Sequence, residues 1–109
     1  MLISPLDANT LAKISNGMCD NLLTCLVRAW DLENSPEKKM KPVVVCPAMN
    51  TAMYQHPLTE KQLNILKNDF NFNIVKPIEK ILVCGDKGIG AMAEISIISD
   101  MLISIVENN

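Results

Sequence analysis

The sequence is poor in metal ligands and in excess charge. It contains a single histidine and four scattered cysteines, with no C-x-x-C pair. Zinc sites and redox-active dithiols need closely spaced Cys and His residues, so the sequence predicts neither of them and no metal. The formal net charge is -2 at pH 7. Because proteins that bind nucleic acid normally present a basic surface, we expect no nucleic-acid partner.

Long apolar runs are also lacking. The longest stretch, from Ile95 to Val106, is interrupted by serines and Asp100, and it falls short of the roughly 20 apolar residues that span a bilayer. Pro5 and Asp7 interrupt the N-terminal stretch before a secretory signal could form. We therefore expect a cytoplasmic protein that has no membrane partner.

The chain of 109 residues has the length of one small domain. Leu, Ile, Val and Met are abundant, so a disulfide scaffold that offsets a weak core is not expected. Cys19, Cys25 and Cys46 are instead predicted to be small buried hydrophobic side chains.

Helical and strand patterns alternate along the chain. Helices are predicted at about Ala8 to Ser15 with Asp7 as cap, Asp20 to Trp30, Thr59 to Asp69 with Thr59 as cap, and over a last segment that carries Ile95, Ile98, Leu102 and Ile105 on one face. Strands are predicted at Leu2 to Pro5, Val43 to Cys46 and Phe72 to Val75. The alternation predicts an α/β fold, a three-layer open parallel sheet. The chain begins as if a strand were already running, so we expect the sheet to be incomplete at the N-terminus.

Three motifs lie where such a sheet binds ligands. Pro5 to Thr10 joins a strand end to a helix start, and Pro47 to Tyr54 follows the Val43 strand. Within the second motif, the Asn50 amide can donate to a carboxylate while its carbonyl accepts an N–H. The third motif, Cys84 to Glu94, is a glycine-rich loop that can close over a ligand. Taken alone, the first motif favours an ordinary helix cap and the second favours core methionines with a turn Asn, while the third suits a phosphate-cradling turn.

Together these motifs resemble the homo-oligomeric flavin-containing Cys decarboxylases, and phosphopantothenoylcysteine decarboxylases in particular. Asp7-Ala8-Asn9-Thr10 and the following helix, ending near Asp20-Asn21-Leu22, are similar to that family's flavin-contacting segment. Pro47 to Tyr54 is similar to its Pro-x-Met-Asn-x-x-Met-Trp substrate clamp, with Tyr54 in the position of Trp. Cys84 to Glu94 is similar to its substrate-recognition flap.

The resemblance implies a Rossmann-like flavoprotein fold and a set of site residues. FMN would be bound by Asp7, Ala8, Asn9, Thr10 and Ala48. Asn50 would hold the cysteinyl carboxylate of the substrate, with Met53 beside it, and Cys84 would be the proton donor. The implied reaction is the FMN-dependent decarboxylation of 4'-phosphopantothenoylcysteine to 4'-phosphopantetheine in coenzyme A biosynthesis.

The resemblance also implies that part of the active site comes from elsewhere. The family's N-terminal half supplies the first strands, the turn around the flavin phosphate and an essential His, and none of these is found in the chain. His56 does not match the catalytic position, so we expect it to be structural. Because the family forms trimers with sites between subunits, a homotrimer or a heterotrimer with a His-supplying chain is expected. Residues 1–109 would form the C-terminal portion of a flavoprotein domain, with a surface insertion at about 32–41.

Two other functions fit parts of the pattern. A lantibiotic-type peptidyl-cysteine decarboxylase would share the Pro47 to Asn50 motif, although Asp7 to Thr10 and Cys84 to Glu94 are more similar to the coenzyme A type. A non-catalytic regulatory subunit of the phosphatase-inhibitor type would share the fold. Such subunits often carry long acidic tails, whereas this chain ends in Glu107-Asn108-Asn109.

Overall fold

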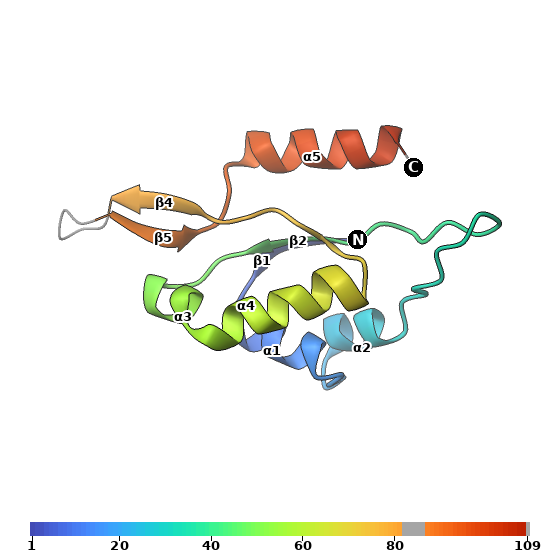
Figure 1. The fold of residues 1–109 in the computed structure, drawn as a ribbon, viewed down its shortest axis with the longest axis horizontal. Coiled ribbons are helices and arrows are strands. Elements are labelled where there is room, and N and C mark those ends of the chain that lie inside the picture. The colour runs from blue at the N-terminus through green and yellow to red at the C-terminus, as the bar shows by residue number, and fades with distance from the viewer. Residues whose placement is uncertain (82–86, 109) are drawn as a thin grey trace.

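A three-stranded parallel sheet lies at the centre of the fold (Figure 1). The computed structural model describes residues 1–81 and 87–108. Strands β1 (Leu2–Leu6), β2 (Val44–Pro47) and β3 (Asn73–Ile74) lie in the order β1-β2-β3. Strands β4 (Ile78–Ile81) and β5 (Lys87–Ala91) form a separate antiparallel pair.

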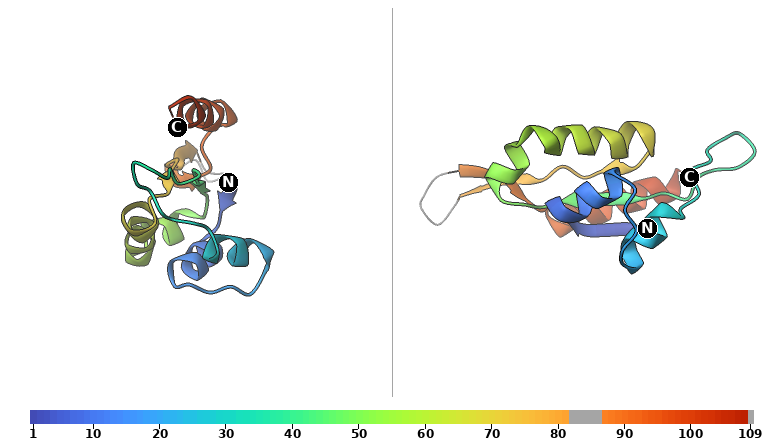
Figure 2. Two further views of the ribbon diagram at one scale, coloured as in Figure 1. Left: turned by 90° about the vertical axis from the view of Figure 1, so that its right-hand side faces the viewer. Right: turned by 90° about the horizontal axis from the view of Figure 1, so that it is seen from below.

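Helices cover both faces of the parallel sheet (Figure 2). One face carries α1 (Ala8–Ser15), α2 (Leu22–Arg28), α3 (Thr51–Gln55) and α4 (Pro57–Asn64), the last continued by a π-helical turn (Ile65–Asp69). The other face carries α5 (Ile95–Glu107). The predicted three-layer α/β fold with a parallel sheet is therefore confirmed.

Strand β2 is buried on both faces, as its β-branched sequence predicts. Val45 belongs to the core cluster beneath α1 and α4, with Leu11 and Leu66. Val44 and Cys46 belong to the cluster beneath α5, with Ile98. Successive side chains of a strand point to opposite faces, so this one strand holds both helical layers.

Helix α2 differs from its prediction in length and in burial. It begins at Leu22 because Asn21 and Thr24 form a capping box, in which the Thr24 N–H donates to Asn21 Oδ1 at 2.8 Å. The predicted span from Asp20 to Trp30 was therefore too long. Val27 is buried, whereas the apolar side chains of Leu22 and Leu26 are exposed.

The cysteine prediction holds only for Cys46. Cys46 is fully buried in β2, whereas Cys19 and Cys25 are exposed. Cys19 lies in the surface turn between α1 and α2, and Cys25 lies on the exposed side of α2. Helical spacing alone could not identify which face of this short helix is covered.

The predicted cap at Thr59 was wrong. Helix α4 begins at Pro57, and its cap is His56, whose Nδ1 accepts the Leu58 N–H at 3.1 Å. Thr59 is buried inside the first turn, and its hydroxyl donates to the Met53 carbonyl. His56 thus has the structural role expected of it.

The glycine-rich segment is partly a strand, where a turn had been expected. Gly88 and Ile89 of β5 pair with Lys80 and Glu79 of β4, and Gly90 lies at an irregularity in the register between them and Ala91. The final helix was predicted correctly in position, and Ile98 is buried, but Ile95 is exposed rather than inward. Among the described residues, no helix is both long and apolar enough to cross a membrane.

Residues 32–41 run as an irregular segment beyond α2 (Figure 1), mostly at the surface, with Met40 buried in the core. The indole N–H of Trp30 donates to the Lys41 carbonyl at 3.0 Å, so the two ends of the segment lie close together. Within it, Lys38 forms ion pairs with Asp31 and Glu33.

Candidate functional site

The carboxyl ends of β1 and β2 lie side by side and bring two of the predicted motifs together. Leu6 pairs with Pro47, and the Ala48 N–H donates to the Leu6 carbonyl at 3.0 Å. Asp7 to Thr10 therefore lies beside Ala48 to Asn50. In open α/β sheets the crevice outside the carboxyl ends of the strands is where ligands bind.

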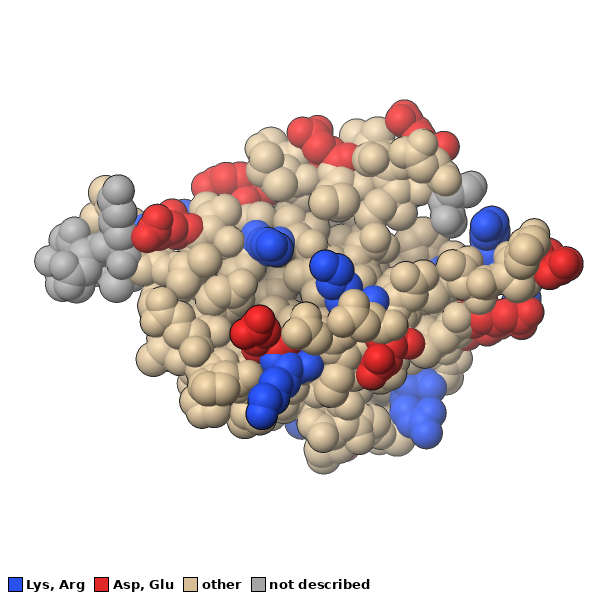
Figure 3. All heavy atoms as spheres, viewed as in Figure 1, with Lys and Arg blue, Asp and Glu red and all other residues tan. Residues whose placement is uncertain are grey.

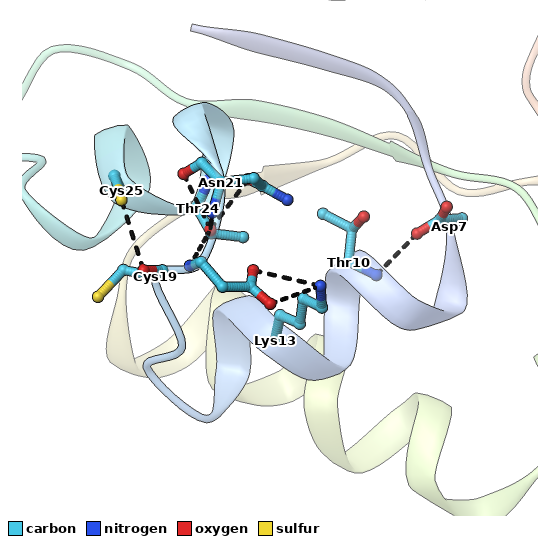
Figure 4. Close-up of polar contacts among 8 residues, drawn as sticks. Asp7, Thr10, Lys13, Cys19, Asn21, Thr24 and Cys25 are labelled. Atoms are coloured by element: carbon cyan, nitrogen blue, oxygen red, sulfur yellow. Dashed lines mark hydrogen bonds and ion pairs between the residues drawn. The ribbon is translucent and has the colours of Figure 1, made fainter.

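Asp7 organises the start of α1 (Figure 4). Its Oδ1 accepts the Thr10 N–H at 2.7 Å, and its backbone carbonyl accepts the Leu11 N–H at 2.9 Å. The hydrogen bond from the Thr10 N–H lowers the pKa of the Asp7 carboxyl, and Lys13 adds a smaller attraction. Asp7 therefore caps α1 as an ionised carboxylate at neutral pH.

The first two amides of α1 remain available for a ligand. Ala8 and Asn9 occupy the first helical turn, where backbone N–H groups have no acceptor within the helix. No other acceptor for these two amides occurs among the residues that the structure describes. The amides and the Asn9 side chain are thus donors at the crevice.

Asn50 caps α3 and keeps its amide donors. Its Oδ1 accepts the Met53 N–H at 2.9 Å. The carbonyl of the side chain is therefore committed to the helix, which leaves the two Nδ2 protons for another acceptor. Asn50 is exposed, and Met53, one turn later, is 52% exposed. This cap places the Asn donor and an apolar thioether at the same end of α3.

Gly90 joins the third motif to the second. The Met49 N–H donates to the Gly90 carbonyl at 2.9 Å. A Cβ added to Gly90 would lie 2.2 Å from the Met49 carbonyl oxygen, and φ of Gly90 is +135°. Only glycine fits this close approach. Gly90 was not among the predicted site residues, although the glycine spacing of the third motif was an available signal.

The predicted site residues thus fall into two groups. Asp7, Ala8, Asn9, Thr10, Ala48, Asn50 and Met53 all follow the ends of β1 and β2, and their assignments to FMN and substrate stay predictions. Cys84 lies outside the described residues, so its predicted role stays a prediction too. Among residues 1–81 and 87–108, no three His, Cys, Asp or Glu side chains are grouped to hold a metal ion.

A groove of about 670 Å³ lies elsewhere, between α4, β3 and α5. Its lining includes Tyr54, Glu60, Lys67 and Met101 but none of the predicted FMN or substrate residues. Lys and Asp or Glu side chains are interspersed on the face of the molecule shown in Figure 3. Glu60 and Lys67 give the groove charges of both signs, and Tyr54, at the end of the second motif, lies at its wall.

An open α/β domain with a crevice at neighbouring strand ends is typical of proteins that bind a cofactor there. The chain belongs to the Flavoprotein family, whose model matches residues 1–107. It is 55% identical over 98 residues to a phosphopantothenoylcysteine decarboxylase of Mus musculus, which covers 90% of this chain and 44% of the mouse protein. The resemblance to phosphopantothenoylcysteine decarboxylases is confirmed.

Solved structures agree with this assignment. A Cys-to-Ser mutant of a PPC decarboxylase complexed with pantothenoylaminoethenethiol has a TM-score of 0.84 and 47% identity, covering 97% of this chain and 54% of that one. The FMN binding protein AtHal3 has a TM-score of 0.83 and 47% identity, covering 99% and 54%. The peptidyl-cysteine decarboxylase EpiD is less similar, with a TM-score of 0.69, 28% identity and coverage of 94% and 55%. The chain spans about half the length of these relatives.

Proposed function

We propose that this chain forms the C-terminal, substrate-clamping half of an FMN-dependent phosphopantothenoylcysteine decarboxylase in coenzyme A biosynthesis. The observation that carries the proposal is the convergence of two motifs, Asp7 to Thr10 and Ala48 to Met53, at one edge of the sheet. Relatives that share this sequence at about half identity carry that activity in their names. Residues 1–109 would be one part of the domain, with 32–41 as a surface insertion.

The residues at the crevice fit a flavin. The amides of Ala8 and Asn9 have no acceptor among the described residues, so they can donate to a ring heteroatom or a carbonyl of the cofactor. Thr10 and Asp7 add polar groups at the same end of the helix, and Ala48 is small enough to lie against a planar ring. Bound FMN would supply the two-electron redox chemistry at the cysteinyl thiol, which makes loss of carbon dioxide feasible.

Asn50 and Met53 would hold the substrate carboxylate that leaves as carbon dioxide. The Asn50 Nδ2 protons are free to donate to the cysteinyl carboxylate, because its Oδ1 already accepts the Met53 N–H. Met53 would form an apolar wall beside that carboxylate. Cys84 would return a proton to the product carbon, since an ordinary thiol with a pKa near ~8.5 is protonated at neutral pH.

A catalytic His must come from another segment of protein. The only His of the chain, His56, uses Nδ1 to cap α4. We therefore place the active site between this chain and a His-supplying segment, in a homotrimer or a heterotrimer in the cytoplasm. The small-molecule substrate would be 4'-phosphopantothenoylcysteine.

Reconstitution tests the proposal. This chain would be co-expressed with the part of the mouse decarboxylase to which it does not align, and the purified complex would be titrated with FMN and assayed for carbon dioxide release. We expect a yellow complex that consumes 4'-phosphopantothenoylcysteine, and a Cys84→Ser variant that binds FMN but forms no product. A complex that retains no FMN after unbound FMN is removed by desalting would refute it.

The same assay separates the alternatives. A peptide ending in cysteine, given at the same concentration, should be a poorer substrate, because EpiD shares only 28% identity with this chain. Preference for the peptide would favour the lantibiotic-type reaction. A Cys84→Ser variant that loses no function in the cell would favour a regulatory subunit.

A further inference from the structure

We propose that Thr59 is a positioning residue for the substrate clamp, the pair formed by Asn50 and Met53. Its buried hydroxyl fixes the end of α3, the short helix that carries the clamp. The role of the clamp rests on the proposed function, whereas the contacts of Thr59 are those of the chain alone. Thr59 would therefore act on a bound substrate only through its neighbours.

Thr59 has no local role that explains its hydroxyl. Helix α4 is capped by His56, and the Thr59 N–H already donates to the His56 carbonyl at 3.0 Å. Thr59 is only 6% exposed, and the other buried polar side chain of residues 1–81 and 87–108 is Thr24, which belongs to the capping box of α2. A hydroxyl costs free energy to bury unless it is hydrogen-bonded. The partner of the Thr59 hydroxyl therefore shows what the residue does.

The partner is the Met53 carbonyl, near the end of α3. Met53 lies six positions before Thr59, beyond the carbonyls three or four positions back that Thr hydroxyls bind within their own helix. The last carbonyls of a helix have no donor within it. Among the described residues, the other donor to the Met53 carbonyl is the His56 N–H, at 3.3 Å. The Thr59 hydroxyl thus joins α4 to the end of α3.

Both sides of the Met53 backbone are held as a result. Its N–H donates to Asn50 Oδ1 at 2.9 Å, and its carbonyl accepts the Thr59 hydroxyl. Helix α3 has only five residues, too few to be stable without outside contacts. Its position therefore depends on the Asn50 cap at one end and on Thr59 at the other. A shift of Met53 would change the direction in which the Asn50 amide points.

Met49, on the other side of Asn50, also touches Thr59. Its Sδ lies 3.8 Å from Thr59 Oγ1. A hydroxyl has one proton to donate, and a carbonyl oxygen is a stronger acceptor than a thioether, so the contact with sulfur is one of packing. Gly90 also holds Met49, because its carbonyl accepts the Met49 N–H at 2.9 Å. Thr59 thus contacts the chain on both sides of Asn50.

Thr59→Val and Thr59→Ser separate the hydroxyl from the shape of the side chain. Valine keeps the shape and removes the hydroxyl, whereas serine keeps the hydroxyl. Both are assayed in the complex reconstituted with the unaligned part of the mouse decarboxylase. We expect Thr59→Val to raise the KM for 4'-phosphopantothenoylcysteine about fivefold or more, the usual effect of losing one hydrogen bond, and to retain FMN as the parent does. Thr59→Ser should restore the KM close to that of the parent.

Thr24→Val is the matched control, because Thr24 is also buried but its hydroxyl serves the capping box of α2. It should lower the unfolding midpoint and leave the KM unchanged. A double variant shows whether Thr59 acts through the clamp. With Asn50→Asp in place, the clamp no longer donates to the substrate carboxylate, so adding Thr59→Val should raise the KM less than it does in the parent.

Hydrogen exchange tests the same contact in the chain alone, without FMN or substrate. The Tyr54 N–H donates to the Asn50 carbonyl at 2.9 Å, so Thr59→Val should speed its exchange about fivefold or more relative to the Leu11 N–H of α1. A complex without decarboxylase activity would refute the proposed function, and this measurement would still decide the role of Thr59. Unchanged Tyr54 exchange would overturn the proposal. An unchanged KM in an active Thr59→Val complex, equal losses in Thr59→Val and Thr59→Ser, or a loss of FMN together with substrate affinity would also overturn it.

Discussion

Met49 and Gly90 are bound to each other across the candidate site. The Met49 N–H donates to the Gly90 carbonyl at 2.9 Å, and the Met49 carbonyl oxygen occupies the space where a Gly90 Cβ would be. Residues 41 positions apart in the chain are thereby joined, backbone to backbone. The β4–β5 hairpin consequently fixes the loop from which Asn50 projects.

Replacing Gly90 with alanine should disrupt this contact. The new methyl group would lie 2.2 Å from a backbone oxygen, and the positive φ adds strain. We expect a loss of more than about 2 kcal/mol of unfolding free energy, together with weaker ligand binding, measured by denaturant unfolding and by FMN titration of the reconstituted complex. Gly17→Ala is the control: it has positive φ but a nearest contact at 3.7 Å, so it should cost only about 1 kcal/mol and leave binding intact.

Substitutions can test the oxygen and the nitrogen of the Asn50 side-chain amide separately. Asn50→Asp keeps an oxygen that accepts the Met53 N–H, but it replaces the amide donors with a negative charge. The variant should fold like the parent and bind FMN, while its KM for the substrate carboxylate rises more than tenfold. Asn50→Ala loses the cap as well, at about 1 kcal/mol. An Asp variant with unchanged KM would show that Asn50 has only a capping role.

Asp7 predicts a pH dependence of stability. Its folded-state pKa lies below the ordinary value because of the hydrogen bond from Thr10. The stabilisation is therefore present above about pH 4, the ordinary Asp range, and is lost as the pH falls through the folded-state pKa. Asp7→Asn should keep most of the cap and flatten the fall in stability at acid pH, whereas Asp7→Ala should lose about 1 kcal/mol at neutral pH. Parallel acid titrations of the parent and the Asn variant that coincide would contradict this.

Local signals predicted much of the fold. Helix α1 has its predicted bounds because Asp7 caps its start and Asn16-Gly17 ends it, and these residues are adjacent to the helix that they determine. Strand β2 was predicted from its β-branched run. For α2, periodicity identified the helix, but the exposure of Leu22 depends on which elements lie nearby, which no local pattern contains.

The rest of the site depends on contacts between distant segments. The sequence predicted that Asp7 to Thr10 and Ala48 to Asn50 would follow strand ends, and the parallel pairing of β1 with β2 brought them together. Gly90 was assigned to a turn because glycine-rich segments favour turns. In the structure it lies in β5, which pairs with β4, and it approaches Met49, which lies far away in the sequence.

The thiols should differ sharply in reactivity. Burial raises the pKa of the Cys46 thiol, and the side chain has no exposed surface. Cys19 and Cys25 are exposed. Brief treatment of the native protein with an aromatic disulfide reagent, followed by peptide mass mapping, should modify Cys19 and Cys25 and leave Cys46 free until denaturant is added. Modification of Cys46 at the rate of Cys25 would show that β2 opens readily.

The segment at 32–41 should tolerate shortening. Trp30 and Lys41 are held together by the indole hydrogen bond at 3.0 Å, so a short link can close the gap between them. The ion pairs of Lys38 are at the surface and contribute little. Replacing residues 33–38 with two glycines should change the unfolding midpoint by only a few degrees, followed by Trp30 fluorescence. Met40→Ala is the contrasting variant, because Met40 is buried, and it should cost about 2 kcal/mol or more. A shortened chain that fails to fold would show that the segment is part of the core structure rather than an insertion.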